Sequence, residues 1–445
     1  MRGNFMRTLV TMFVLVAPAV LQAGEPVVIS KSPAGEVANG LSYQPAITPD
    51  GRYIAYCSEA TNLGSGNHGA ISNLFLYDSS VETTELIGTN SPVVKGQGSC
   101  AHADISADGR YVVFEYGASL VNWQDVFLYD RNSGVTSLIS ASPSGGESKY
   151  GYSWYPRISD DGRYVIFSSV LRNQFIPSPT DTRNFGTFIF DTKTGVLSDT
   201  LQEGFQSSDI NSDGRYFVFE KMIESPADPG DVIMAIFRMD RLKGVVARVD
   251  VTGSGIGGNK DAQWPRISAD GRYVAFSSEA DNLVSGDDND VEDVFLKDME
   301  TGTIQAISMA DDANLGGGDS RRPEISGDGS VIVFRAEAAN RSGMYRFDRE
   351  SKRVSIIGRG ALSASLNRDG GVIAIADKQV RLLKKSGGES QVTIDPVTTE
   401  GETDTKSNND SPQGGGAFGF VVFLWLMMLR LRCGLLGRPE KVCNS

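Results

Sequence analysis

The sequence predicts an all-β fold, a β-propeller of seven four-stranded blades, and three observations carry this prediction. First, the motif PRISADGRYVAFSS at residues 265–278 recurs seven times along the chain. Second, its copies are 41 to 58 residues apart, in or near the spacing of propeller blades. Third, each copy precedes two further short apolar runs, so one period holds four strands. The Asp-Gly pairs of the copies begin at Asp50, Asp108, Asp161, Asp213, Asp270, Asp328 and Asp369.

Each copy of the motif predicts a hairpin, because Asp-Gly between two apolar runs favours a tight turn. The third strand of a period is a run such as DVFLYD at residues 125–130. These runs are apolar at successive positions, as expected for a sheet covered on both faces by neighbouring blades. The last two copies carry Ser330 and Gly371 where the others have Arg, so a ring of six blades is the alternative.

Closure of the ring requires one strand from each end of the propeller chain. Residues 27–30 (VVIS) resemble the fourth strand of a blade and precede the first hairpin, so we expect them to complete the last blade. Residues 391–394 (QVTI) compete for the same place.

Composition and motifs exclude several function classes. The chain has 445 residues and a formal net charge of −13, which repels phosphate backbones, so no nucleic-acid partner is expected. A G-x-S-x-G elbow is missing, and His68 and His102 are the two histidines. His102 aligns with Tyr155 and Trp264 of other copies, which favours a packing role. The G-x-G-x-x-G pattern that begins at Gly253 precedes another strand rather than a helix, so we interpret it as a loop between blades and expect no nucleotide cofactor.

Charged residues recur just before the Ile of the first strand in five copies. If they reach the central channel, they line it as candidate binding residues. The alternative, which we favour, is mutual salt bridging between adjacent blades, such as Asp104 with Arg157 or Asp209 with Arg266. The five residues are Asp104, Arg157, Asp209, Arg266 and Glu324.

Two further features are candidate structural sites. Cys57 and Cys100 are the cysteines of the repeat region, and a disulfide would join the first two blades; otherwise Cys57 is a small buried residue. A loop with four Asp residues has enough oxygens for a calcium ion, although its spacing does not fit the helix-loop-helix calcium pattern. Its alternative is a solvated connector. The four residues are Asp287, Asp288, Asp290 and Asp293.

The N-terminus predicts export. Two arginines precede an apolar run at residues 9–20, and small residues follow, which is typical of a signal peptide over residues 1–23 with cleavage after Ala23. A rival cleavage site follows Ala19. The propeller is then expected over residues 24–394.

The C-terminus predicts a membrane segment. Residues 395–413 are polar and acidic, which predicts a disordered linker. Gly414, Gly415 and Gly416 then open an apolar stretch, and we expect a transmembrane helix over residues 414–436 with a cytoplasmic tail at 437–445, because basic residues follow the apolar run. Cleavage near the three glycines and a lasting single-span anchor are the alternatives.

Two resemblances to known families follow from these motifs. The pattern P-x-I-S-x-D-G-R-Y followed by D-V-F-L-Y-D resembles the repeat of bacterial TolB-type, WD-like β-propellers over residues 27–394. The Gly-rich, apolar and basic C-terminus resembles the GlyGly-type sorting signal of Gram-negative bacteria, which implies a rhomboid-like sorting protease as a partner and a location in the periplasm or at the cell surface.

The propeller resemblance implies a non-catalytic scaffold that binds an envelope or surface protein or peptide. The alternative is an envelope hydrolase or lyase that acts on peptide or glycan at the axial face. A cluster of coupled acids with a nearby His in the channel would favour this enzyme.

Overall fold

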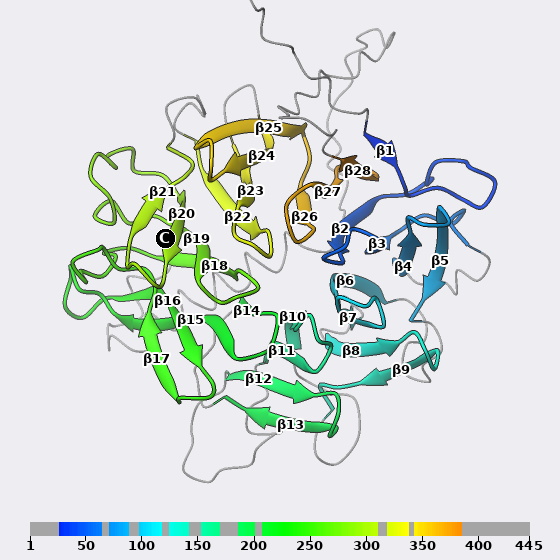
Figure 1. The fold of residues 1–445 in the computed structure, drawn as a ribbon, viewed down its shortest axis with the longest axis horizontal. Coiled ribbons are helices and arrows are strands. Elements are labelled where there is room, and N and C mark those ends of the chain that lie inside the picture. Colours follow the sequence, from blue (N-terminus) through cyan, green and yellow to red (C-terminus); the bar gives the residue numbers. More distant parts are fainter. Residues whose placement is uncertain are drawn as a thin grey trace, which may run out of the picture.

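The computed structural model describes residues 26–64, 71–88, 98–117, 124–141, 153–169, 186–200, 207–309, 318–337 and 342–384. These residues form 28 β-strands and no helix. The strands make seven four-stranded antiparallel sheets that stand around a common axis, which confirms the seven-bladed propeller (Figure 1). The six-bladed alternative is wrong, because the eroded seventh copy forms a blade of its own.

The strands follow the repeats. Blades 1 and 2 consist of β2 (Ser42–Ile47), β3 (Tyr53–Ser58), β4 (Asn73–Asp78), β5 (Thr83–Ile87), β6 (Ser99–Ile105), β7 (Tyr111–Gly117), β8 (Asp125–Asp130) and β9 (Val135–Leu138). Blades 3 and 4 consist of β10 (Ser153–Ile158), β11 (Tyr164–Ser169), β12 (Gly186–Asp191), β13 (Val196–Asp199), β14 (Ser208–Ile210), β15 (Tyr216–Glu224), β16 (Val232–Asp240) and β17 (Val245–Arg248).

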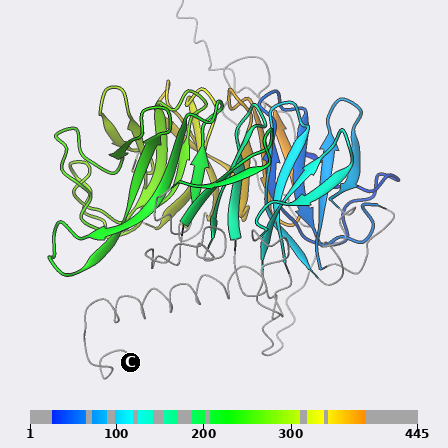
Figure 2. The same ribbon diagram turned by 90° about the horizontal axis from the view of Figure 1, so that it is seen from below.

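Blades 5 and 6 consist of β18 (Ala262–Ile267), β19 (Tyr273–Ser278), β20 (Asp293–Asp298), β21 (Ile304–Ala306), β22 (Ser320–Ile325), β23 (Val331–Ala336), β24 (Gly343–Asp348) and β25 (Arg353–Arg359). Blade 7 consists of β26 (Ser363–Leu366), β27 (Val372–Ala376), β28 (Val380–Lys384) and β1 (Val27–Val28). In side view the strands run between two faces of the ring (Figure 2). We call the face with the Asp-Gly turns the turn face, and the face where one blade connects to the next the loop face.

The Asp-Gly turn is held by its own side chains. In blade 5, the Ser268 hydroxyl donates to Asp270 Oδ1 at 2.6 Å and accepts from the Tyr273 backbone N–H at 2.9 Å. Gly271 has φ of +77°, a left-handed conformation that favours glycine. A Cβ at Gly271 would also overlap the ring of Tyr216 in the preceding blade. The turn therefore needs glycine both for its backbone and for the close packing of two blades.

The Arg that follows each Asp-Gly pair connects the hairpin to the third strand. Arg272 Nη2 lies 2.7 Å from Asp298 Oδ2, at the end of β20. This pairing explains why the motif D-G-R is followed by a run that ends in Asp. The equivalent pairs are Arg52–Asp78, Arg110–Asp130, Arg163–Asp191 and Arg215–Asp240.

The N-terminal strand closes the ring, as the sequence predicts. β1 pairs with β28 in antiparallel register, with Val27 opposite Leu382. The backbone N–H of Ile29 donates to the Val380 carbonyl at 2.9 Å, and the Ile29 side chain is buried. The competing residues 391–394 lie outside the described residues.

A disulfide joins Cys57 on β3 to Cys100 on β6, with Cα atoms 5.7 Å apart. Both residues are buried in the hydrophobic cluster between blades 1 and 2. The bond therefore ties together the first two blades of the ring.

Four predicted segments lie outside the described residues. These are the signal peptide with Ala23, the polar linker, the helix that begins at Gly414, Gly415 and Gly416, and the tail after it. Within the described ranges, no helix has the length and apolar character needed to cross a membrane.

Candidate functional site

Five inner strands carry a β-bulge at the same position. In blade 5, Gln263 pairs with Ser277 and Arg266 pairs with Ala275, so Trp264 and Pro265 together oppose one residue. A bulge of this kind redirects the side chain it carries. The first bulge residue has positive φ in each of these strands, and the residues are Gln44, His102, Tyr155, Trp264 and Arg322.

These five side chains meet around the axis although they come from five blades, and we call them the axial ring. The rings of His102 and Tyr155 lie 4.3 Å apart, and those of Tyr155 and Trp264 make an edge contact at 5.4 Å. The Arg322 guanidinium lies 4.8 Å from the centroid of the Trp264 ring, a cation–π contact. The contact of the His102 ring with Tyr155 agrees with the packing role that the sequence favours for His102.

Gln44 sets the tautomer of a neutral His102 ring. Gln44 Oε1 accepts a hydrogen bond from the His102 backbone N–H at 2.9 Å, which orients the amide so that its Nε2 faces His102 Nε2, also at 2.9 Å. The amide NH₂ can only donate, so His102 Nε2 accepts. A neutral His102 then carries its proton on Nδ1, 3.0 Å from Glu115 Oε1. Gln44 thus occupies Nε2, and Glu115 is the acid nearest to Nδ1.

The five charged residues that the sequence singled out lie two positions further along the inner strands, toward the turn face. We call them the axial charge cluster. Arg157 Nη2 and Arg266 Nε both lie 2.9 Å from Glu324 Oε1. Arg157 belongs to blade 3 and Glu324 to blade 6, so this ion pair crosses the axis. Arg266 and Glu324 belong to adjacent blades, so their ion pair is of the kind that the salt-bridge alternative describes.

The particular pairs expected between adjacent blades are wrong. Asp104 and Asp209 instead accept hydrogen bonds from backbone N–H groups of the next blade, at Ile158 and Ile267, each at 2.9 Å. β10 and β18 are edge strands of their sheets, so these N–H groups have no partner strand on that side, and the carboxylates satisfy them. The sequence could not show that these carboxylates bind backbone N–H groups rather than arginines, because every residue type except Pro carries a backbone N–H.

The cluster holds more carboxyl groups than guanidinium groups, and their pKa values diverge accordingly. Removal from water would raise the pKa of Glu324, but Arg157 and Arg266 outweigh this and lower it. Burial raises the pKa of Asp104 to about 6 against the opposing effect of Arg157, and burial also raises the pKa of Asp209. Arg157 and Arg266 therefore stabilise the ionised form of Glu324 more than that of Asp104 or Asp209.

Two acids next to the axial ring were not singled out by sequence reasoning. Glu115 on β7 accepts the Tyr155 backbone N–H at 2.5 Å, and Glu220 on β15 accepts the Trp264 backbone N–H at 2.8 Å. Burial raises the pKa of Glu220 to about 8. Within the described residues, its Oε2 has no hydrogen-bond partner. The available signal was an acid directly after an apolar run (VVFE and FVFE), where the third and fifth copies have Ser168 and Ser277.

The acidic loop does not gather its side chains into a metal site. Asp293 is buried and accepts hydrogen bonds from Ser308 and Asn289. Asp290 is exposed and lies 3.4 Å from Lys260 Nζ. Among the residues that the structure describes, no three His, Cys, Asp or Glu side chains are placed to hold a metal ion. Asp287, Asp288, Asp290 and Asp293 are thus not gathered as one ligand group, and calcium binding by this loop stays a prediction beside the solvated connector.

The Gly253 segment lies in the loop between β17 and β18, as predicted. His68 lies outside the described residues.

No family model matches the chain, and no curated protein is significantly similar to it in sequence. Solved structures do match. TolB from Acinetobacter baumannii is 16% identical over 79% of this chain, with a TM-score of 0.41, and the chain spans 65% of that TolB chain.

Two other structures superpose better. An oligogalacturonate lyase in complex with manganese is 14% identical, covers 79% of this chain and 90% of its own, and has a TM-score of 0.50. The β-propeller domain of the Trilobed protease from Pyrococcus furiosus is 13% identical, covers 80% and 99%, and has a TM-score of 0.51. At these identities the likeness establishes the β-propeller fold alone.

Proposed function

We propose that this chain is an exported envelope or surface β-propeller that binds a protein or peptide at the axial ring without catalysing a reaction. The observation that carries the proposal is the convergence of Tyr155, Trp264 and Arg322 from three blades. Trp, Tyr and Arg are the residue types that most often dominate binding energy at protein interfaces. Arg322 is exposed, and its guanidinium contacts the Trp264 ring and, among the described residues, forms no ion pair.

The absence of a free general base in the ring supports binding rather than catalysis. The His102 nitrogens face Gln44 and Glu115. A general base must reach the proton that it abstracts from the substrate, and His102 would first have to leave both partners.

Capture of partners tests this proposal. The purified full chain and its Arg322→Ala variant are used to pull down proteins from an envelope extract. Arg349→Ala is the matched control, because Arg349 also stacks on an aromatic ring, that of Tyr273 at 4.0 Å, outside the axial ring. We expect a specific partner to be lost with Arg322→Ala and kept with Arg349→Ala. Equal capture by all three proteins would exclude the axial ring as the binding surface.

Export and anchoring belong to the same proposal and rest on the two chain ends. The signal peptide places the propeller in the periplasm or at the cell surface, and residues 414–436 hold it in the inner membrane until a sorting protease cuts near Gly414 to Gly416. Mass spectrometry of the surface-exposed protein decides between cleavage and a lasting anchor. An intact Ser445 on that form contradicts cleavage.

One observation favours the second candidate, a hydrolase or lyase that acts on peptide or glycan at the axial face. Glu220 has a pKa of about 8 and so carries a proton at neutral pH, as a general acid must. Turnover of peptidoglycan, glycan or peptide pools that disappears with Glu220→Gln would favour this enzyme over the scaffold.

A further inference from the structure

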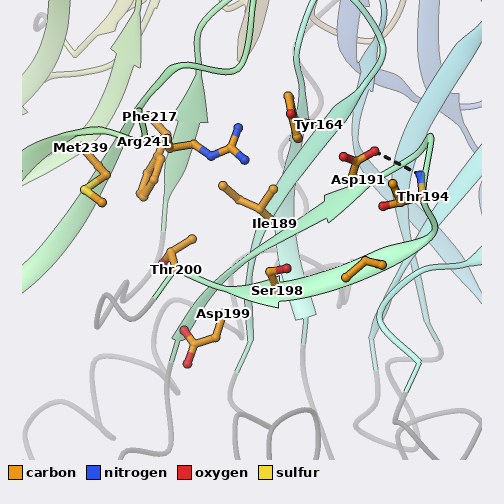
Figure 3. A pocket seen from close by; sticks show the side chains of 11 residues that line it. Tyr164, Ile189, Asp191, Thr194, Ser198, Asp199, Thr200, Phe217, Met239 and Arg241 are labelled. Carbon is orange, nitrogen blue, oxygen red and sulfur yellow. Dashed lines mark hydrogen bonds between the residues drawn. The ribbon is translucent and has the colours of Figure 1, made fainter. Parts of the chain in front are cut away.

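A pocket of about 430 Å³ lies between blades 3 and 4, away from the axial ring (Figure 3). Ile189, Phe217 and Met239 give it an apolar floor, and Thr200, Tyr164 and Arg241 lie around them. Its volume falls in the range of small-molecule pockets.

The pocket exists because blade 3 lacks a side chain that closes the other blade interfaces. One buried aliphatic residue belongs to the hydrophobic cluster of each of the six other interfaces, and it lies within two residues of the end of the outer strand. These residues are Ile29, Ile87, Ile139, Val249, Ile307 and Ile357. Among the residues that the structure describes, the cluster between blades 3 and 4 contains no such residue.

Backbone hydrogen bonds identify the residue that takes this place in blade 3. The N–H of Ile139 donates to Val126, and that of Ile307 donates to Val294. In blade 3 the N–H of Thr200 donates to Thr187 in the same way, so two threonines replace two buried aliphatic residues. The Thr200 hydroxyl turns to the Thr187 carbonyl at 2.8 Å and leaves the apolar floor uncovered.

Arg241 adds a positive charge to the pocket. Its Nη1 donates to the Gly214 carbonyl at 2.6 Å, and its guanidinium lies 4.1 Å from the centroid of the Tyr164 ring. Figure 3 shows the guanidinium reaching over Ile189 from the side of blade 4. Among the described residues no carboxylate forms an ion pair with Arg241, whereas Asp191 in the same pocket is paired with Arg163. A guanidinium held by stacking, with donors to spare, suits a carboxylate.

We propose that this blade 3–4 pocket is a second binding site, for a ligand that joins an apolar group to a carboxylate. The apolar group takes the space that Ile or Val fills at the other interfaces, and the carboxylate meets Arg241. Both a free small acid and the C-terminal residue of a peptide have this chemistry. The site does not depend on the function proposed for the axial ring.

The test uses 3-phenylpropionate as the probe, with the full chain observed by ligand-detected NMR and calorimetry. We expect 3-phenylpropionate to bind at least tenfold more tightly than its neutral amide. Thr200→Ile should weaken binding at least tenfold because the new side chain fills the pocket, and its melting temperature should be no lower than that of the parent chain. Arg241→Gln should remove the preference for the acid over the amide.

Two matched variants separate this site from the rest of the molecule. Arg349→Gln changes the equivalent stacked arginine between blades 5 and 6, where Ile307 closes the interface, and Arg322→Ala changes the axial ring. Neither should alter binding of the probe. The peptide Ala-Ala-Phe, with a free C-terminus or as its C-terminal amide, distinguishes a peptide end from a small acid as the ligand. Tighter binding of the free peptide than of 3-phenylpropionate assigns a peptide end. Weaker binding of the free peptide assigns a small acid. No binding of 3-phenylpropionate, or binding unchanged by Thr200→Ile, would overturn the proposal.

Discussion

Glu220 is the residue whose ionisation should be most visible in the stability of the propeller. Burial raises its pKa to about 8, whereas an unfolded Glu titrates near about 4.3. Between these two values the folded protein holds a proton that the unfolded chain has released. The stability that Glu220 contributes is therefore complete below about pH 4.3 and is lost as the pH rises to about 8, by up to about 1.4 kcal/mol per pH unit.

Glu220→Gln tests this dependence, because Gln stays neutral and keeps an oxygen that can accept the Trp264 N–H. Thermal melts from pH 5 to pH 8 should show a shallower decline in the variant than in the parent chain. Glu36→Gln changes an exposed acid and serves as the control. Parallel profiles for the parent and Glu220→Gln would show that Glu220 is not protonated in the folded state.

At the scale of the element, the Asp-Gly turn makes a sharp prediction about two glycines. Gly271 and Gly286 both have positive φ, at +77° and +83°. A Cβ at Gly271 would overlap Tyr216, whereas a Cβ at Gly286 would have no neighbour within 4 Å. Ala at either position costs about 1 to 2 kcal/mol for the left-handed backbone, and Gly271→Ala adds about 1 to 3 kcal/mol for overpacking. Denaturant unfolding of the two variants measures the difference, and equal losses would mean that the blade contact contributes nothing.

The same turn shows what the sequence could reveal. Ser268, Asp270 and Gly271 hold the hairpin by contacts that span six residues, so the repeat motif alone was enough to predict every blade. The axial ring was visible only in part. The bulge position holds five different residue types in the five blades. The residue types Gln and Arg do not indicate a positive φ, so Gln44 and Arg322 could not be recognised from the sequence.

Contacts across the axis were beyond sequence reasoning for a different reason. The ion pair of Arg157 with Glu324 joins residues 167 positions apart, and the order of blades suggested neighbours instead. The pocket at Thr200 could have been found, because the other outer strands are followed or ended by Ile or Val. Finding this pocket from the sequence requires an alignment of the fourth strands, which are short and vary more than the hairpins.

At the scale of the whole molecule, the disulfide and the closing strand secure the ring on either side of blade 1. The disulfide closes a loop with a sequence separation of 43 residues. A loop of this length restricts the unfolded chain enough to stabilise the fold by about 3 to 4 kcal/mol in the chain-entropy model. The double variant Cys57→Ala, Cys100→Ala should therefore unfold at lower denaturant concentration than the parent. A midpoint and slope identical to those of the parent would mean that the bond adds no stability.

The closing strand carries the last prediction. β1 is short, yet Ile29 beside it is buried in the cluster between blades 7 and 1, and the Ser30 hydroxyl accepts the Val380 N–H at 3.1 Å. Removing residues 25–30 takes away one buried Ile, worth about 1.5 to 3 kcal/mol, and exposes the edge of β28. We expect a lower melting temperature and concentration-dependent association through the free edge. Val27→Ser is the control, because Val27 is exposed and its backbone pairing remains.

Closure of the ring by β1 also bears on the export that we propose. Both expected cleavage sites, after Ala19 and after Ala23, leave β1 on the mature chain. Its partner β28 lies more than 350 residues later, so in a chain exported as we propose the ring closes only when nearly the whole propeller has crossed the membrane. Such a distant pairing forms late, because the entropy of closing the long loop is lost before the contact forms. Pulse proteolysis during refolding should therefore cut the truncated and parent chains at equal rates at early times and at different rates only at the end. Early protection that depends on residues 25–30 would contradict late closure.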